Sequence, residues 1–424
     1  MLNITVTLCV ALLAAASASA ADPPGDPPDD AGALSVADQA ETAKPSSQSW
    51  RVFGEGALSR SSLRGNASAI EGSRVSLDLR YDGTVAPGVR AVLSDRLDLI
   101  HSNAAPRETN VNTLREAYLS WHVAPDAIAD IGRINLRYGA AFGYNPTDFF
   151  KAGALRSIVS LDPTSLRENR QGTVVVQGQK LWSEGSLTLA FSPRLAGTPS
   201  GSTFALDLGA TNPSNRWLVS GSYKVGEGFN PQILLYGGPG TPSQAGFNLS
   251  SLLNSATVAY LEFSTGKGRP LIAQSLGLAE PERVQRRTAV GLTYTTSFNL
   301  SLTAEYEHNT AAPDRQQWNA FSSGGPTDAR RLLGVAQAQQ ELPVRQALFL
   351  YASWRDMLAR NLDLSAFIRY DPATRSREQW VETRYHWSKV EVALQYQLYS
   401  GAPASLYGSV PQARKVEALL RLFL

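Results

Sequence analysis

The chain has 424 residues, of which 43% are hydrophobic and 18% charged, and its 39 basic groups nearly balance its 37 acidic groups. Charges of both signs are interspersed, which argues against a nucleic-acid partner, because phosphate binding needs a clustered basic face. No stretch approaches the roughly 20 consecutive apolar residues of a membrane-spanning helix.

The first 20 residues have the pattern of a cleavable secretory signal. An apolar core covers residues 2–16, and Ala18-Ser19-Ala20 forms a small-x-small cleavage motif. We therefore predict a signal peptide over residues 1–20, although no lysine or arginine precedes the apolar core. The only cysteine, Cys9, lies inside this segment, so the mature chain has no thiol for disulfides, catalysis or metal binding.

Residues 21–49 combine five prolines and six acids with few large apolar side chains. A segment of this composition cannot bury enough surface to order itself. We predict a disordered periplasmic tail, with a docking peptide for a partner as the alternative.

From Trp50 onward, apolar and polar residues alternate with a period of two, as in strands that present one side-chain set to each face. Residues 74–82, 299–307, 361–370 and 389–399 show the pattern most clearly. A soluble β-sandwich has the same alternation, so the pattern predicts strands without choosing between the two architectures.

The lengths of the connections favour a membrane barrel. Short connections follow the even-numbered strands, whereas those after odd-numbered strands include the long segments 139–171, 193–215, 237–255 and 308–343, an asymmetry typical of outer-membrane barrels. We predict an all-β fold over residues 50–424, a transmembrane antiparallel up-and-down β-barrel of about 18 strands, or 16 without the weakest strand, 270–276. The expected strands lie near 50–58, 73–82, 88–99, 112–121, 127–138, 172–182, 185–192, 216–225, 230–236, 256–264, 270–276, 285–296, 299–307, 344–354, 361–370, 378–387, 389–399 and 413–424.

The last of these strands alternates up to the chain terminus and can pair with the first, as a closed membrane barrel requires. Together with the signal, this predicts the outer membrane of a Gram-negative bacterium, with the C-terminus and the N-terminal tail in the periplasm. The expected partners are membrane lipid, lipopolysaccharide and the barrel-assembly machinery. Either a monomer or a homotrimer fits the sequence.

The third outer connection, 139–171, is too apolar to extend into water. It contains Phe149 and Phe150, a turn at Asn145-Pro146, and a short helix expected over 163–171 with proline in its first turn. We predict that this loop folds into the lumen and narrows it.

Charged side chains with lumen parity and those of the third loop are the candidate selectivity residues, because rings of fixed charge filter polar solutes. We expect arginines of strands 73–82 and 88–99, opposite acids such as Glu116 and Asp148, to set a transverse field across the constriction. The alternative is that these charges pair across strands and only satisfy one another. The candidates are Arg74, Arg80, Arg90, Arg96, Glu116, Tyr118, Arg133, Asp148, Lys151, Arg167, Arg170, Arg369, Glu382 and Arg384.

Three motifs resemble those of the alginate-export-type barrels: Leu114-Arg115-Glu116-Ala117-Tyr118-Leu119-Ser120-Trp121, Ile131-Gly132-Arg133, and Tyr144-Asn145-Pro146-Thr147-Asp148. The placement of the third loop also resembles that in the general porins. These resemblances imply passive passage or export of polar solutes, anionic or saccharide-like, through the lumen. The alternative is a structural or assembly barrel of an envelope polysaccharide-secretion apparatus without an open pore.

The sequence offers little for catalysis, and we expect a protein that is not an enzyme. His386-Trp387-Ser388 has the His-x-Ser spacing of the outer-membrane phospholipases, in which histidine activates serine, but no third polar group is evident to orient the imidazole. The four histidines lack ligand spacing, so neither a metal site nor a cofactor is predicted. The aromatic side chains best placed to stack a sugar are Tyr118, Trp318 and Trp380.

Overall fold

The computed structural model describes residues 49–65, 69–226, 228–323 and 325–424. The predicted signal peptide, 1–20, lies outside these residues, as does the predicted tail, 21–49, except for its last residue. Both therefore stay predictions.

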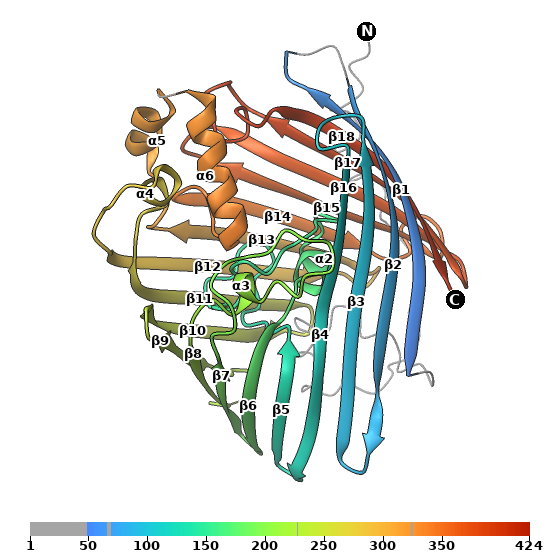
Figure 1. The fold of residues 1–424 in the computed structure, drawn as a ribbon, viewed down its shortest axis with the longest axis vertical. Helices are drawn as coiled ribbons and strands as arrows, with labels where there is room; N and C mark the ends of the chain where they lie inside the picture. The colour runs from blue at the N-terminus through green and yellow to red at the C-terminus, as the bar shows by residue number, and fades with distance from the viewer. Residues whose placement is uncertain (1–48, 66–68, 227, 324) are drawn as a thin grey trace.

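Eighteen antiparallel strands form one closed sheet (Figure 1). Consecutive strands pair along the chain, and β1 also pairs with β18, where Phe53 lies opposite Phe423. Pairing the first strand with the last removes the terminal edges that a membrane could not hydrate. The predicted 18-stranded closed antiparallel barrel is therefore confirmed. The strands are β1 (Trp50–Leu63), β2 (Ala69–Ala86), β3 (Val89–Ser102), β4 (Glu108–Ala124), β5 (Ala127–Ile134), β6 (Thr173–Trp182), β7 (Gly185–Ser192), β8 (Arg216–Tyr223), β9 (Gln232–Gly238), β10 (Thr241–Asn254), β11 (Thr257–Gly268), β12 (Arg283–Thr295), β13 (Leu300–Asn309), β14 (Gln346–Trp354), β15 (Leu362–Asp371), β16 (Ser376–His386), β17 (Val390–Ser400) and β18 (Gln412–Phe423).

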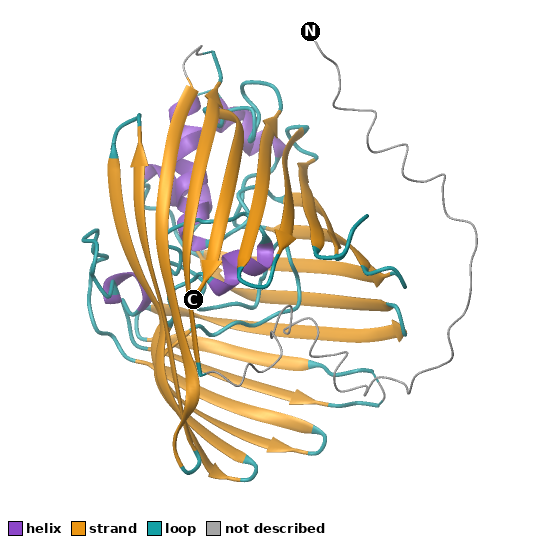
Figure 2. Ribbon diagram, turned by 90° about the vertical axis from the view of Figure 1, so that its right-hand side faces the viewer, coloured by secondary structure: helices purple, strands orange, loops and turns teal. Residues whose placement is uncertain are grey.

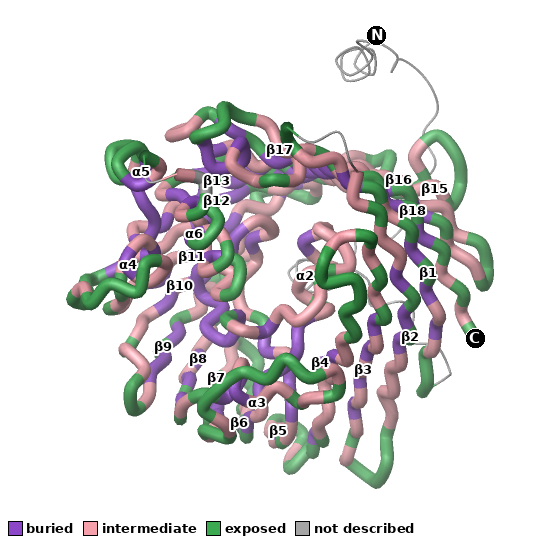
Figure 3. The backbone as a smooth tube through the Cα atoms, turned by 45° about the horizontal axis from the view of Figure 1, so that its top comes forward, coloured by how far each residue is buried: buried purple, intermediate pink, exposed green. Residues whose placement is uncertain are grey.

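The alternation in the sequence separates an outer apolar face from an inner polar face, and buried and exposed positions alternate along the strands (Figure 3). On β2, Val75 and Leu77 are exposed, whereas Arg74, Ser76 and Asp78 are buried. Because successive side chains of a strand point to opposite faces, the exposed apolar set forms the outer surface of the barrel and the buried polar set lines the lumen.

The predicted strand number is correct because two errors cancel. The segment 270–276, predicted as a strand, contains helix α4 (Leu271–Leu276), which follows Pro270 and ends at Gly277 in the left-handed conformation; both residue types mark helix ends. The segment 237–255, predicted as a long loop, contains β10 instead. A turn at Pro239-Gly240 joins β9 to β10, and a proline followed by a glycine with positive φ fits a type II turn.

The connections sort by end of the barrel, as the sequence predicted. One end, here called the short-turn end, carries turns such as 87–88, 125–126, 183–184 and 255–256. The first described strand begins at this end and the last strand finishes there, since Trp50 pairs with Tyr81 close to the 87–88 turn. The opposite end, the long-loop end, carries the long connections 135–172, 193–215, 269–282 and 310–345.

The helices of the described residues lie in these long connections, and the strands make up the wall (Figure 2). Helix α5 begins with a capping box between Asp314 and Gln317. Trp318 and Leu332 share a buried cluster with Leu406, so two connections of the long-loop end pack as one unit. None of the described helices is long and apolar enough to cross a membrane. The remaining helices are α2 (Pro163–Glu168), α3 (Leu208–Thr211), α5 (Arg315–Ser322) and α6 (Pro326–Gln339).

Candidate functional site

One long connection, residues 135–172, runs inside the barrel and is here called the inserted loop. It starts four residues earlier than predicted because β5 ends at Ile134 rather than 138, and its helix α2 ends at Glu168 rather than 171. The ring of Phe149 stacks on Tyr236 with centroids 5.0 Å apart. Burial of a large apolar side chain contributes about 1.5–3 kcal/mol, so the apolar residues hold the loop inside, as the sequence predicted. Phe149 and Phe150 pack against inward-facing side chains of β6, β8 and β9, namely Val175, Leu218, Leu234 and Tyr236.

Two wall carboxylates bind the backbone of the inserted loop. The amide of Ala141 donates to Glu262 of β11 at 2.6 Å, and the amides of Phe142 and Gly143 donate to Glu305 of β13 at 2.6 and 2.8 Å. Buried backbone N–H groups need acceptors, and the carboxyl oxygens of Glu262 and Glu305 provide them for three successive residues of the loop. This carboxylate clamp fixes the start of the loop to the wall.

The close approach of the loop to the wall also requires a glycine. A Cβ atom at Gly143 would lie 2.1 Å from the Glu307 carboxylate and 2.7 Å from the ring of Phe349. No side chain fits there, so the backbone of the loop reaches the wall directly. Three acids of the wall, Glu262, Glu305 and Glu307, were not among the predicted selectivity residues. The alternation of 299–307 nevertheless places Glu305 and Glu307 on the polar face.

Several candidate selectivity residues are instead anchors of the inserted loop. Asp148 and Arg170 form a buried pair at 2.8 Å within the loop. Lys151 lies 3.3 Å from Glu341, which ties the inserted loop to the connection 310–345. Arg133 is also buried and donates to backbone carbonyls, and Arg167 donates to the Gly139 carbonyl at 3.1 Å. Asp148, Lys151 and Arg170 are therefore paired with other charges, although not across strands, whereas Arg133 and Arg167 bind backbone carbonyls.

Glu341 is the common acceptor between the two loops, and its contribution depends on pH. Burial alone would raise the pKa of its carboxyl, but Lys151 and Arg287 outweigh burial and hold that pKa below its usual range. A carboxyl with a lowered folded pKa stabilises the protein above its unfolded pKa of about 4.3, and this stabilisation disappears as the pH falls through the folded pKa.

We expect Glu341→Gln to lower the free energy of unfolding at pH 7 by about 3–5 kcal/mol, because it leaves two buried cations without their anion. The thermal unfolding midpoints of the native and variant proteins should approach each other as the pH falls from 5 to 3. The exposed pair of Glu280 with Arg283 supplies the control, and Glu280→Gln should keep the native pH dependence. Parallel curves for native protein and Glu341→Gln across this range would contradict the assignment.

The wall formed by β1–β4 and β18 contains a buried network of charges centred on Glu55. The Glu55 carboxylate accepts hydrogen bonds from Arg74 at 2.9 Å, Arg96 at 2.8 Å and Arg421 at 3.0 Å. Arg96 also bonds Asp98 at 2.9 Å. Two of the predicted selectivity residues, Arg74 and Arg96, thus share one acid on the inner face of the barrel wall.

Arg115 belongs to the same network and was missed. It donates to Asp78 at 2.7 Å, although simple alternation assigns its neighbour Glu116 to the lumen. The register shifts between Ser94 and Asp95 of the partner strand, and an extra residue at such a bulge reverses the parity beyond it. Both neighbours therefore face inward, and Glu116 accepts from the Asn135 amide at 3.4 Å.

A second set of lumen charges stays accessible, and in it the cation is more exposed than the anion. The exposed side-chain fractions are 25% for Arg421 against 2% for Glu55, and 33% for Lys415 against 6% for Glu417. Arg80 and Arg90, at 40% and 46%, share the single acid Asp82 at 31%. In the pairs of Arg369 with Glu307 and of Arg384 with Glu382, the cation is again more exposed than the acid. In these pairs, the accessible charge is therefore mainly positive.

The barrel is similar in fold to solved structures of bacterial Occ proteins. OccAB1 of Acinetobacter baumannii matches with a TM-score of 0.56 and 10% identity over 88% of this chain and 96% of that chain. OccK5 (OpdH) of Pseudomonas aeruginosa matches with a TM-score of 0.54 and 10% identity over 88% and 97%. The fold is that of the Occ porins. OccK2 (OpdF) of the same organism gives 0.52 and 9% over the same shares.

At this identity the likeness concerns the fold alone. No family model matches the sequence, and no curated protein matches it. The similarity to alginate-export-type barrels stays a prediction.

His386 is held by two carboxylates, which corrects the sequence-based view that no polar group orients its ring. Asp363 and Glu391 each lie 3.1 Å from one of its ring nitrogens. With both nitrogens engaged by acids, neither is left to accept a proton from Ser388. The imidazole links β15, β16 and β17 at the short-turn end.

The three aromatic candidates for sugar stacking lie in different surroundings. Trp318 is buried among the long-loop connections, where its indole donates to the Ala404 carbonyl at 2.9 Å, so this residue has no face open to the lumen. Tyr118 packs beside the Phe149 cluster. Trp380 lies on the inner wall against Phe367.

Proposed function

We propose that this protein is an outer-membrane channel for the passive passage of small polar anions, with both chain termini in the periplasm and no enzymatic activity. The observation that carries the proposal is the exposure of the lumen charges. In the pairs of Lys415 with Glu417, Arg421 with Glu55 and Arg369 with Glu307, the cation is more exposed than its acid. A lumen surface of fixed positive charge attracts anions and repels cations.

The fold and the inserted loop support the same function. The barrel shares the architecture of the Occ porins, and the clamp of Glu262 and Glu305 holds a loop across its interior. A loop held by buried hydrogen bonds gives a constriction of constant shape. Charges next to such a constriction act on every solute that passes, which favours selection by charge.

The test is ion flow through the refolded protein in planar bilayers. A tenfold gradient of potassium chloride should give a reversal potential of the sign expected for chloride preference. The preference should weaken as ionic strength rises from 0.1 to 1 M, because the screening length falls from about 10 Å to about 3 Å. No current at all would leave the structural or assembly barrel as the better function, and a potassium preference would contradict the anion assignment.

A further inference from the structure

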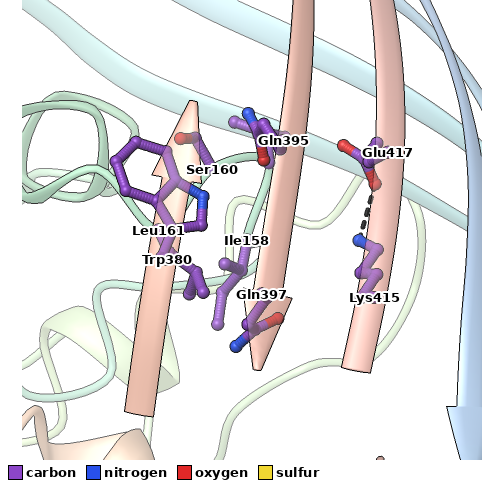
Figure 4. Close-up of a pocket in the computed structure, with 9 residues that line it drawn as sticks. Ile158, Ser160, Leu161, Trp380, Gln395, Gln397, Lys415 and Glu417 are labelled. Carbon is purple, nitrogen blue, oxygen red and sulfur yellow. Dashed lines mark ion pairs between the residues drawn. The ribbon is translucent and has the colours of Figure 1, made fainter. Parts of the chain in front are cut away.

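A pocket lies in the lumen wall where the inserted loop passes β16, β17 and β18 (Figure 4). Its loop side is mainly apolar and comes from Ile158, Val159 and Leu161. Its strand side is polar. Trp380 of β16 completes the lining, whose polar members are Ser160, Gln395, Gln397, Lys415 and Glu417.

Trp380 has an unused hydrogen-bond donor at this pocket. The side chain is only 3% exposed, yet its indole nitrogen has no hydrogen-bond partner among the described residues. Stacking on Phe367, with centroids 5.6 Å apart, sets the orientation of the ring, and Figure 4 shows the nitrogen on the side toward Gln395 and Ile158. A buried indole N–H normally finds a partner, so the position is prepared for an acceptor that the chain does not supply.

The formal charges of the pocket lining balance one another. Lys415 and Glu417 pair at 2.6 Å, and the other lining side chains are neutral, so the lining has no net charge. The second oxygen of Glu417 is also buried and accepts no hydrogen bond from the described residues, and its nearest cation, Arg74, lies 3.6 Å away. One unpaired N–H donor and one carboxylate oxygen without a hydrogen bond, beside an apolar loop, match a ring that carries several hydroxyl groups and has apolar C–H faces.

We propose that this pocket is a binding subsite for a neutral, hydroxylated ring of the pyranose type. The Trp380 indole donates to one ring hydroxyl, Glu417 accepts from another, and the loop side covers the C–H face of the ring. This proposal rests on the proposed channel function, because a solute can reach the subsite only through an open lumen. Binding itself does not require ion flow, so the two can fail separately.

The test is binding of methyl β-D-glucopyranoside to the refolded protein in detergent micelles, followed by saturation-transfer difference NMR. Trp380→Phe removes the N–H group and keeps an aromatic ring. We expect it to raise the dissociation constant about threefold to tenfold, the net worth of one hydrogen bond. Trp387→Phe is the matched control, because Trp387 is 54% exposed and does not line the pocket; it should bind like the native protein.

A second variant fills the pocket without touching the wall. Ile158 is 39% exposed on the inserted loop, so Ile158→Trp should block the pocket and abolish binding. The variant should still show the heat-modifiable migration of a folded barrel in gel electrophoresis. Equal binding by the native protein, Trp380→Phe and Ile158→Trp would overturn the proposal. So would displacement of the glucoside by equimolar sodium gluconate, which would assign it to the anion path. Glucoside binding without ion current in bilayers would instead reject the channel and keep the subsite.

Discussion

Replacing Arg80 and Arg90 together by glutamate should convert chloride preference into potassium preference. Both side chains are nearly half exposed, and among the described residues their ion-pair partner is Asp82. A unit charge about 4 Å from a passing ion interacts with it by roughly 1 kcal/mol even in bulk water. Reversing the charge of both side chains should therefore change the ratio of chloride to potassium permeability by about tenfold or more. The reversal potential in a potassium chloride gradient measures this change.

Two comparisons separate the lumen effect from a change in net charge. Arg360→Glu with Lys389→Glu alters the total charge equally, but both residues are exposed in turns of the short-turn end, so the selectivity should stay native. Arg96→Glu is unsuitable as a probe, since Arg96 bonds Glu55 and Asp98 inside the wall and its loss would test folding. Equal shifts in the two double variants would show that Arg80 and Arg90 do not control selectivity.

Replacing Glu305 by leucine should release the inserted loop from the wall. The carboxylate binds the amides of Phe142 and Gly143 and the hydroxyl of Tyr260. An unpaired buried amide costs about 1–3 kcal/mol, so the loop attachment weakens by roughly 2–6 kcal/mol. We expect larger and noisier single-channel currents, together with new tryptic cleavage after Arg156 in a barrel that still migrates as folded.

Variants of the same strand provide the controls for this result. Glu305→Gln keeps one acceptor oxygen and should give an intermediate effect. Glu307→Gln should leave the loop attached, because the Glu307 oxygens accept no hydrogen bond from the described residues, and the closest cation, Arg369, lies 3.8 Å away. A Glu305→Leu protein with native conductance and native resistance to trypsin would show that the clamp does not hold the loop.

The strands and their faces could be predicted from the sequence because both are local properties. Alternation on segments such as 74–82 and 299–307 assigns the lumen side residue by residue, and the parity of long and short connections identifies the barrel. The same reasoning failed where the local signal was weak. The apolar segment 270–276 fits a strand as well as a short helix, and the small inward residues of β10 hid a strand that Pro239-Gly240 could have revealed.

The sequence by itself determined a closed barrel with a polar lumen and one apolar loop inside it, because period, composition and connection length suffice for these features. Only the tertiary structure decided which lumen charges are accessible. Arg80 and Arg96 have the same parity and similar neighbours in sequence, but Arg96 meets Glu55 across three strands, whereas Arg80 meets only Asp82. Pairing between distant strands is a long-range property. It therefore separates charges that hold the barrel together from charges that can act on a solute.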